Sequence, residues 1–417
     1  MRFFYSLITL LLLALMALFT SCEKDDAQDE FYNVAVPVVK PIEEFRAMVK
    51  ISEPRAISEA GKIYTHGDYV FVNDDQKGVH IIDNSDHRSP VKIKFLEIPQ
   101  NTDIAVKDDM LFANSAMDLV VFDISDINNI SQEESIKNVF PNHNSRIPAG
   151  ASFVDSDNFN AETEVVVGYV METRKIEMAN DTGWLTNDRA SFSESGNSSG
   201  GSGTGGSLAR FNIHEDFLYV VDQNQLSVFN IEGLSTPELL KTDWVGTGIE
   251  TIFYKENHLY LGSSTGMYIY SVENPEVPEF RSMFRHILGC DPVVVKGDIA
   301  YVTIRGGNLC GQEWSQLDVI DVADKSNPQL LQTYDMENPY GLGVKDDWLF
   351  VCDGTAGLKI YDTKNTPNLE LIDHFQDINT YDVIPLEDVL LMVGDNTLFQ
   401  YTYKGNEINL LSSFNLN

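Results

Sequence analysis

The chain has 417 residues, of which 63 are acidic and 29 are basic, so its formal net charge is −34 at pH 7. This composition argues against a nucleic-acid partner, because binding to phosphates requires a basic surface. The same charge disfavours direct adsorption of the folded body to an anionic membrane, so any attachment there is expected through a lipid anchor only.

Residues 1–21 are predicted to be a signal peptide. The apolar run over residues 7–19 is shorter than a typical transmembrane helix. Ser21 and Cys22 follow it. A small residue directly before a cysteine at this place resembles the lipobox of bacterial lipoproteins. Acyl chains on Cys22 would anchor the protein, since each buried methylene contributes about 0.8 kcal/mol. An ordinary cleaved signal with an unmodified Cys22 is the alternative.

Residues 22–44 are predicted to be a lipidated tether. Lys24 is followed by Asp25 and Asp26, which resembles the export signal that sends lipoproteins to the cell surface in the Bacteroidetes. We therefore expect a protein anchored in the outer membrane with its body exposed at the cell surface. A body that faces the periplasm is the alternative, in which the charged residues only keep the tether solvated.

Residues 45–417 are predicted to form one domain, because a unit of about 41 residues recurs along them. Each copy reads as a strand, a polar, mostly acidic turn and a second strand, and the copies begin at Lys62, Asp103, Arg210, Thr251, Pro292, Gly341 and Asp382. Such a period, with four short strands in each unit, indicates a β-propeller. We expect an all-β fold with seven four-stranded blades, and eight blades as the alternative.

One unit illustrates the pattern. Its apolar runs are Tyr340–Val344, Trp348–Cys352, Leu358–Tyr361 and Leu369–Phe375. Polar turns with glycines separate them, and no helical periodicity fits between them. The four runs are therefore predicted to be the four strands of one blade.

The third strands of the units share a sequence pattern. They read VHIID, LVVFD, LSVFN, MYIYS, LDVID and LKIYD, starting at Val79, Leu119, Leu226, Met267, Leu317 and Leu358. This pattern resembles the LVIVD repeat of bacterial β-propeller proteins, which are common as lipoproteins in the Bacteroidetes. The resemblance covers roughly residues 62–417 and is most specific at Leu317–Pro328. The final Asp or Asn of each strand is expected to start an Asx turn by accepting a hydrogen bond from the backbone two residues on.

An insertion over about residues 131–207 interrupts the period. Thr163–Glu177 is predicted to be the outer strand of the second blade, and Ser193–Ser207 is predicted to be a flexible Gly/Ser linker. The eight-bladed alternative places a degenerate blade in this insertion.

Three cysteines follow Cys22. In a propeller, Cys290 before the first strand of the fifth blade and Cys310 in its second-to-third-strand loop lie on the same face, conventionally the top. We predict a disulfide between them, closing a loop of about 20 residues and contributing roughly 3 kcal/mol; two free thiols are the alternative. Cys352 ends a central strand and is predicted to be a small buried apolar residue.

Candidate ligand-binding residues lie at the top of the predicted channel. Arg305 and Trp314 flank the longest top loop and are residue types favoured at binding hot spots. Aligning the units places further polar and aromatic residues at the channel mouth, where propellers commonly bind ligands: Asp103, Arg210, Glu250, Asp291, Tyr340, Tyr381 and Asp382.

No catalytic or metal-binding motif is present. The histidines lack metal-ligand spacing; His66 and His214 occupy the position that turn lysines hold in other units. No EF-hand spacing and no G-x-S-x-G elbow at a strand-to-helix turn occurs, and no cofactor is expected; a structural calcium ion among the acidic turns is the alternative. We expect a non-catalytic binding scaffold that presents its top loops to a protein or a glycan. The alternatives are a structural or assembly protein of the envelope, and a propeller hydrolase or lyase.

Overall fold

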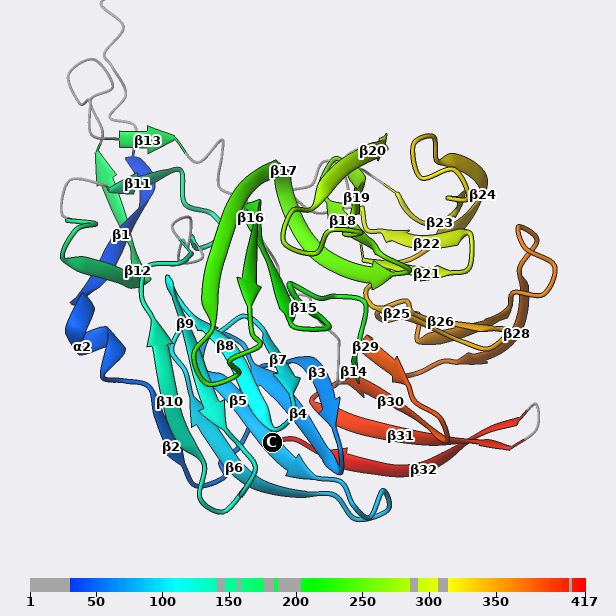
Figure 1. The fold of residues 1–417 in the computed structure, drawn as a ribbon, viewed down its shortest axis with the longest axis horizontal. Helices are drawn as coiled ribbons and strands as arrows, with labels where there is room; N and C mark the ends of the chain where they lie inside the picture. The colour runs from blue at the N-terminus through cyan, green and yellow to red at the C-terminus, as the bar shows by residue number, and fades with distance from the viewer. Residues whose placement is uncertain are drawn as a thin grey trace, which may run out of the picture. The chain divides into compact units, whose positions relative to one another are not determined.

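The computed structural model describes residues 31–140, 147–155, 159–175, 184–186, 204–285, 292–306, 314–404 and 407–417. Among these residues the regular elements are strands, apart from the short helix α2 (Ile42–Arg46) (Figure 1). None of the described helical residues forms a segment long and apolar enough to cross a membrane. The chain divides into two compact units, each described by itself below.

The first unit is a small sheet with the strand order β12-β1-β11-β13. Its strands are β1 (Phe31–Pro41) as far as Val39, β11 (Phe153–Asp155), β13 (Trp184–Thr186) and the part of β12 (Glu164–Lys175) from Gly168 on. Val34 and Phe153 are buried together, and the guanidinium of Arg174 donates to Asp155 at 2.6 Å. The range 22–44, predicted to be a tether, therefore contains a strand from Phe31 on, because its apolar residues VAVPVV favour one.

The second unit consists mainly of antiparallel four-stranded groups in which each strand pairs with the next along the chain. The first two groups are β3 (Ala60–His66), β4 (Tyr69–Asp74), β5 (Gly78–Asp83) and β6 (Val91–Glu97), then β7 (Ile104–Lys107), β8 (Met110–Ser115), β9 (Asp118–Asp123) and β10 (Ser131–Ile136). The short strand β2 (Lys50–Ser52) pairs with the outer edge of β6.

The middle of the unit is one continuous sheet of six strands. They are β15 (Phe211–His214), β16 (Phe217–Asn230), β17 (Glu238–Lys255), β18 (His258–Ser263), β19 (Gly266–Ser271) and β20 (Glu279–Arg285). The first part of β17 pairs with β16 and its last part pairs with β18. One long strand thus serves as the outer strand of one group and the inner strand of the next.

The last three groups return to the simple pattern. They are β21 (Val293–Lys296), β22 (Ile299–Ile304), β23 (Ser315–Asp321) and β24 (Gln329–Met336); β25 (Leu342–Lys345), β26 (Trp348–Cys352), β27 (Leu358–Asp362) and β28 (Glu370–Phe375); and β29 (Thr380–Pro385), β30 (Val389–Gly394), β31 (Thr397–Lys404) and β32 (Glu407–Asn415). The strands predicted between Tyr340 and Phe375 are confirmed, with boundaries shifted by at most two residues.

The inner strands form a closed ring. β3, β7, β15, β17, β21, β25 and β29 contact one another in this order, and β29 contacts β3 again (Figure 1). This arrangement is a β-propeller, in which neighbouring sheets bury their apolar faces against each other. At the junction between the last and first groups, Ile384 and Leu391 pack with Ile63 and Val72. Burial of such faces contributes about 25 cal/mol per Å² of apolar surface.

The outer strand of the second group differs from the prediction. β10 (Ser131–Ile136) pairs with β9, whereas Thr163–Glu177 does not supply that strand. The segment SQEESI carries almost no apolar residues, because an outer strand faces solvent and needs only backbone hydrogen bonds to its neighbour. The prediction of Thr163–Glu177 as this outer strand, which rested on its apolar residues, is therefore wrong.

The terminal residues of the third strands form the predicted Asx turns. In each case a side-chain oxygen accepts a hydrogen bond from the backbone N–H two residues on, at 2.8–3.4 Å; the acceptors are Asp83, Asp123, Asn230, Ser271, Asp321 and Asp362. The prediction from the repeat is confirmed, with the Ser271 hydroxyl in place of a carboxylate or amide in one repeat.

A glycine begins the third strand, or directly precedes it, in three groups because no side chain fits there. Gly78, Gly266 and Gly357 have positive φ, and a Cβ on each would overlap a carbonyl oxygen of the outer strand. Only glycine combines this backbone conformation with such a close approach.

The turns between first and second strands link neighbouring groups. Lys107 reaches Asp216 at 2.6 Å, Lys345 reaches Glu387 at 3.0 Å, and the His66 Nε2 lies 3.0 Å from Asp109. The interpretation of His66 as a turn residue in the lysine position is confirmed. These exposed pairs contribute little individually, and their repetition joins successive blades.

Candidate functional site

Two aspartates join neighbouring inner strands at the centre of the propeller. The Asp103 carboxylate accepts hydrogen bonds from the backbone N–H groups of Arg210 and Phe211 at 2.7 and 3.0 Å, and Lys62 Nζ lies 3.5 Å from it. Asp382 Oδ1 accepts from the Val383 N–H at 3.0 Å. Both carboxylates and Lys62 are buried, so we call these three side chains the axial cluster.

Burial perturbs the acid–base behaviour of the axial cluster. It raises the pKa of Asp382 to about 7, although hydrogen bonds and the charge of Lys62 act in the opposite direction. Burial likewise lowers the pKa of Lys62 to about 8, against the attraction of Asp103. Asp382 Oδ2 has no hydrogen-bond partner among the residues that the structure describes. The cluster therefore holds a carboxyl group that titrates near neutral pH inside the protein.

A short segment of the insertion covers the axial cluster. Strand β14 (Thr204–Gly205) pairs with the inner strand β3, and Ser207 Oγ accepts a hydrogen bond from the Leu342 N–H at 2.8 Å. A Cβ on Gly206 would overlap the Asp382 carboxylate, so the glycine backbone packs directly on that group. The prediction of a flexible linker is therefore wrong for residues 204–207: glycine allows a flexible chain, but it also allows a backbone to enter a narrow channel.

Tyr340 and Tyr381, predicted from equivalent positions in two repeats, lie together at a pocket. Their ring centroids are 5.1 Å apart, and the Arg305 guanidinium lies over the Tyr340 ring at 4.2 Å. The pocket has a volume of about 210 Å³ and is lined by Ala60, Tyr340, Asn379, Thr380, Tyr381, Val393, Gly394, Asp395 and Asn396. We call this the tyrosine pocket.

Backbone contacts hold the walls of the tyrosine pocket. The Tyr340 N–H donates to the Cys352 carbonyl at 2.7 Å, which fixes the start of the inner strand. Asp395 accepts from the Asn379 N–H at 3.2 Å, and Asn396 accepts from the Ala60 N–H at 3.3 Å. The walls thus come from the first residues of β3 and β29, from the loops before β25 and β29, and from the end of β30 with the β30–β31 turn.

The other predicted site residues are not gathered at the tyrosine pocket. Asp103 and Asp382 are buried, and Arg210 and Glu250 are half-buried, directly before β15 and on β17 respectively. Trp314 is exposed. Cys22, Lys24, Asp25, Asp26, Cys290, Asp291 and Cys310 lie outside the described residues, so the anchor, the export signal and the disulfide stay predictions. Cys352 is a buried free cysteine, as predicted, and burial raises the pKa of its thiol.

Comparison with known proteins supports the repeat and the fold. The LVIVD repeat matches residues 58–94, 205–242 and 290–336. The chain is an LVIVD-repeat β-propeller protein. No curated protein is significantly similar to it over its sequence.

Solved structures resemble this LVIVD-repeat protein in fold alone. A protein from Lactobacillus plantarum is 12% identical, with a TM-score of 0.50 over 85% of this chain and 96% of its own. A periplasmic gluconolactonase from Pseudomonas aeruginosa is 10% identical, with a TM-score of 0.50 over 85% and 95%. A functionally unknown protein from Desulfotomaculum acetoxidans is 10% identical, with a TM-score of 0.51 over 84% and 95%.

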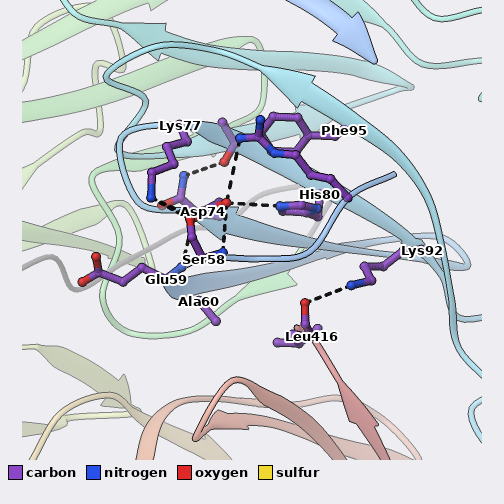
Figure 2. Close-up of polar contacts among 12 residues, drawn as sticks. Ser58, Glu59, Ala60, Asp74, Lys77, His80, Lys92, Phe95 and Leu416 are labelled. Atoms are coloured by element: carbon purple, nitrogen blue, oxygen red, sulfur yellow. Dashed lines mark hydrogen bonds and ion pairs between the residues drawn. The ribbon is translucent and has the colours of Figure 1, made fainter. Parts of the chain in front are cut away.

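The LVIVD-repeat protein also contains a set of capping aspartates that sequence reasoning missed. Asp74, at the end of β4, accepts hydrogen bonds from the Ser58 N–H and hydroxyl and from the Glu59 N–H, and His80 lies 3.5 Å away (Figure 2). Burial would raise the pKa of Asp74, but hydrogen bonds from His80 and Ser58 outweigh burial and hold that pKa well below its usual range.

Asp353 and Asp395 cap the equivalent loops of the last two groups. Asp353 accepts from the N–H groups of Glu337 and Asn338, and Asp395 accepts from that of Asn379. The available signal was the recurrence of VND, VCD and VGD at the end of the second strand. This recurrence could have identified one wall of the tyrosine pocket.

The described part of the LVIVD-repeat protein shows no group of three or more His, Cys, Asp or Glu side chains placed to hold a metal ion. The axial cluster has carboxylates and an amine, but the backbone of residues 204–207 covers it. The tyrosine pocket, by contrast, combines aromatic rings with amide and carboxylate groups at an open surface. It is the better candidate for reversible binding.

Proposed function

We propose that this protein is a non-catalytic, lipid-anchored scaffold of the outer membrane, a seven-bladed propeller of the Bacteroidetes lipoprotein type, that binds a glycan in the tyrosine pocket. The pairing of Tyr340 and Tyr381 beside Asn379 and Asn396 carries the proposal. Aromatic rings cover the apolar face of a sugar, while amides exchange hydrogen bonds with its hydroxyl groups.

The size of the tyrosine pocket favours a glycan over a large ligand. Its volume of about 210 Å³ is below the range of about 300–1,000 Å³ that is typical of drug-sized ligands. One sugar ring is a suitable occupant, and the rest of the chain would extend into solvent. Affinity is then expected to be modest for one unit and to rise by multivalent display on a membrane.

Replacing Tyr381 with alanine is expected to weaken glycan binding at least about tenfold, because the pocket loses one aromatic face. Tyr381→Phe keeps that face and should retain most of the affinity. A glycan array with the purified protein selects the ligand, and isothermal titration calorimetry compares the variants. Equal binding by the wild type and Tyr381→Ala would contradict the proposed site, and no binding to any glycan would contradict the function.

An envelope assembly protein is the second candidate, because the outer strands expose apolar side chains. Leu330 and Leu331 on β24, Leu371 and Ile372 on β28, and Phe280 on β20 are all exposed. Such residues can contact a protein partner. The double variant Leu330→Ser, Leu371→Ser is a matched control for the glycan-binding assay, in which it should bind the glycan like the wild type. In cells, loss of a cross-linked envelope protein from this variant would favour the assembly role.

The lipid anchor rests on Cys22. Cys22→Ser is expected to move the protein from the membrane fraction to the soluble fraction, because the remaining chain has no acyl group to insert. Fractionation with immunoblotting measures the change, and protease treatment of intact cells tests surface exposure separately. A Cys22→Ser variant that stays in the membrane fraction would refute the anchor without bearing on the tyrosine pocket.

A further inference from the structure

The capping aspartates differ in how their negative charge is balanced. Asp353 is fully buried and lies 2.6 Å from Lys359 Nζ. Asp74 is also buried and lies 3.5 Å from His80 Nε2, with Lys77 at 3.8 Å (Figure 2). Each of these carboxylates therefore has a basic group from its own blade as a neighbour.

Strand register shows where that basic group is placed. Lys359 is the partner of Val351 across β26 and β27, and His80 is the partner of Val72 across β4 and β5. Val351 and Val72 each lie two residues before their capping aspartate. The residue two before Asp395 is Val393, and its partner is Leu398. The third capping aspartate thus has a leucine at the register position of the base.

Asp395 consequently has no basic side chain within ion-pair distance among the described residues, and it is exposed on the wall of the tyrosine pocket. The described lining of this pocket contains no lysine, arginine or histidine. A ligand with a positive charge would form with Asp395 the kind of ion pair that Lys359 forms with Asp353. A ligand with a carboxylate would instead meet an unbalanced like charge.

We propose that the tyrosine pocket recognises an amino sugar with a free, protonated amine, and that Asp395 is the residue that determines this specificity. The inference rests on the proposed glycan-binding function and names the class of glycan. The ring of Tyr381 adds attraction for a cation through its face, whereas the Tyr340 ring already carries the Arg305 guanidinium. The net charge of −34 further raises the local concentration of cationic ligands.

The test uses three defined probes with the full mature protein: oligomers of glucosamine, of N-acetylglucosamine and of galacturonic acid. Calorimetry at a slightly acidic pH, where the amine is protonated, should show glucosamine oligomers binding about threefold to fivefold more tightly than the acetylated ones, as expected for one exposed ion pair. Asp395→Asn should abolish this preference, and Asp388→Asn, a change in the β29–β30 turn outside the pocket, should retain it.

Equal binding of the glucosamine and acetylated oligomers by the wild type would overturn the inference and leave the proposed function standing. Tighter binding of galacturonate oligomers, or of a lysine-rich peptide in place of any sugar, would also overturn it. Failure of all glycans would refute the proposed function itself.

Discussion

Replacing Asp353 with alanine is expected to lower the free energy of unfolding by about 3–5 kcal/mol, the usual cost of breaking a buried ion pair. The Asp353 carboxylate is fully buried, accepts hydrogen bonds from the N–H groups of Glu337 and Asn338, and pairs with Lys359 at 2.6 Å. Its removal leaves two backbone donors and a largely buried amine without their acceptor. Urea unfolding followed by tryptophan fluorescence measures the loss.

Two controls separate the charge from the packing. Asp388→Ala, at an exposed turn, should leave stability unchanged within about 0.5 kcal/mol. The double variant Asp353→Ala, Lys359→Met should recover part of the loss, because it removes the unpaired amine as well. A loss below about 1 kcal/mol for Asp353→Ala would show that water replaces the carboxylate without difficulty.

Asp382→Asn is expected to stabilise the protein at pH 8 by about 1–3 kcal/mol and to have little effect at pH 4. The folded-state pKa of Asp382 is about 7, above the value of an ordinary aspartate, so the folded state favours the protonated form. The stability from this carboxyl group is complete at acidic pH and is lost as the pH rises toward about 7. Asparagine cannot ionise, and its carbonyl oxygen can still accept the Val383 N–H.

Urea unfolding of both proteins at pH 4, 6 and 8 tests this expectation. The difference in stability should grow steadily with pH, and other titrating groups cancel because they are common to both proteins. Asp388→Asn should show no such trend. If Asp382→Asn is less stable at pH 8, the carboxylate is ionised and stabilised by Lys62, and the strong effect of burial on its pKa is refuted.

Much of the blade architecture could be predicted from sequence because its causes are local. The strands between Tyr340 and Phe375 appear within two residues of their predicted bounds, and Asp321 and Asp362 form the Asx turns that the repeat implies. Alternating apolar residues, turn glycines and short-range side-chain hydrogen bonds act over a few residues. Such features are visible in each copy of the repeat.

The candidate site could be predicted only in part. Tyr340 and Tyr381 are predictable because they hold equivalent positions in adjacent repeats, which the ring brings together. Asp395 and Asn396 complete the pocket from the β30–β31 turn, which lies beside the start of β29. Ala60 belongs to β3, near the other end of the chain. Pairing of β29 with β30 brings Asp395 beside Asn379 within one blade, whereas Ala60 and Tyr340 join the pocket only when neighbouring blades pack and the ring closes.

The sequence by itself determined the repeat, the strands and the turns, because periodic hydrophobicity and turn chemistry are local properties. Tertiary structure alone decided that SQEESI is an outer strand, that residues 204–207 enter the channel, and that Asp103 and Asp382 are buried. Each of these outcomes depends on which backbone groups still need hydrogen-bond partners, and which spaces are still unfilled, once the blades have packed. Such requirements arise between residues that are far apart in the chain, and burial, which then shifts the pKa of Asp382, exists only in the folded state.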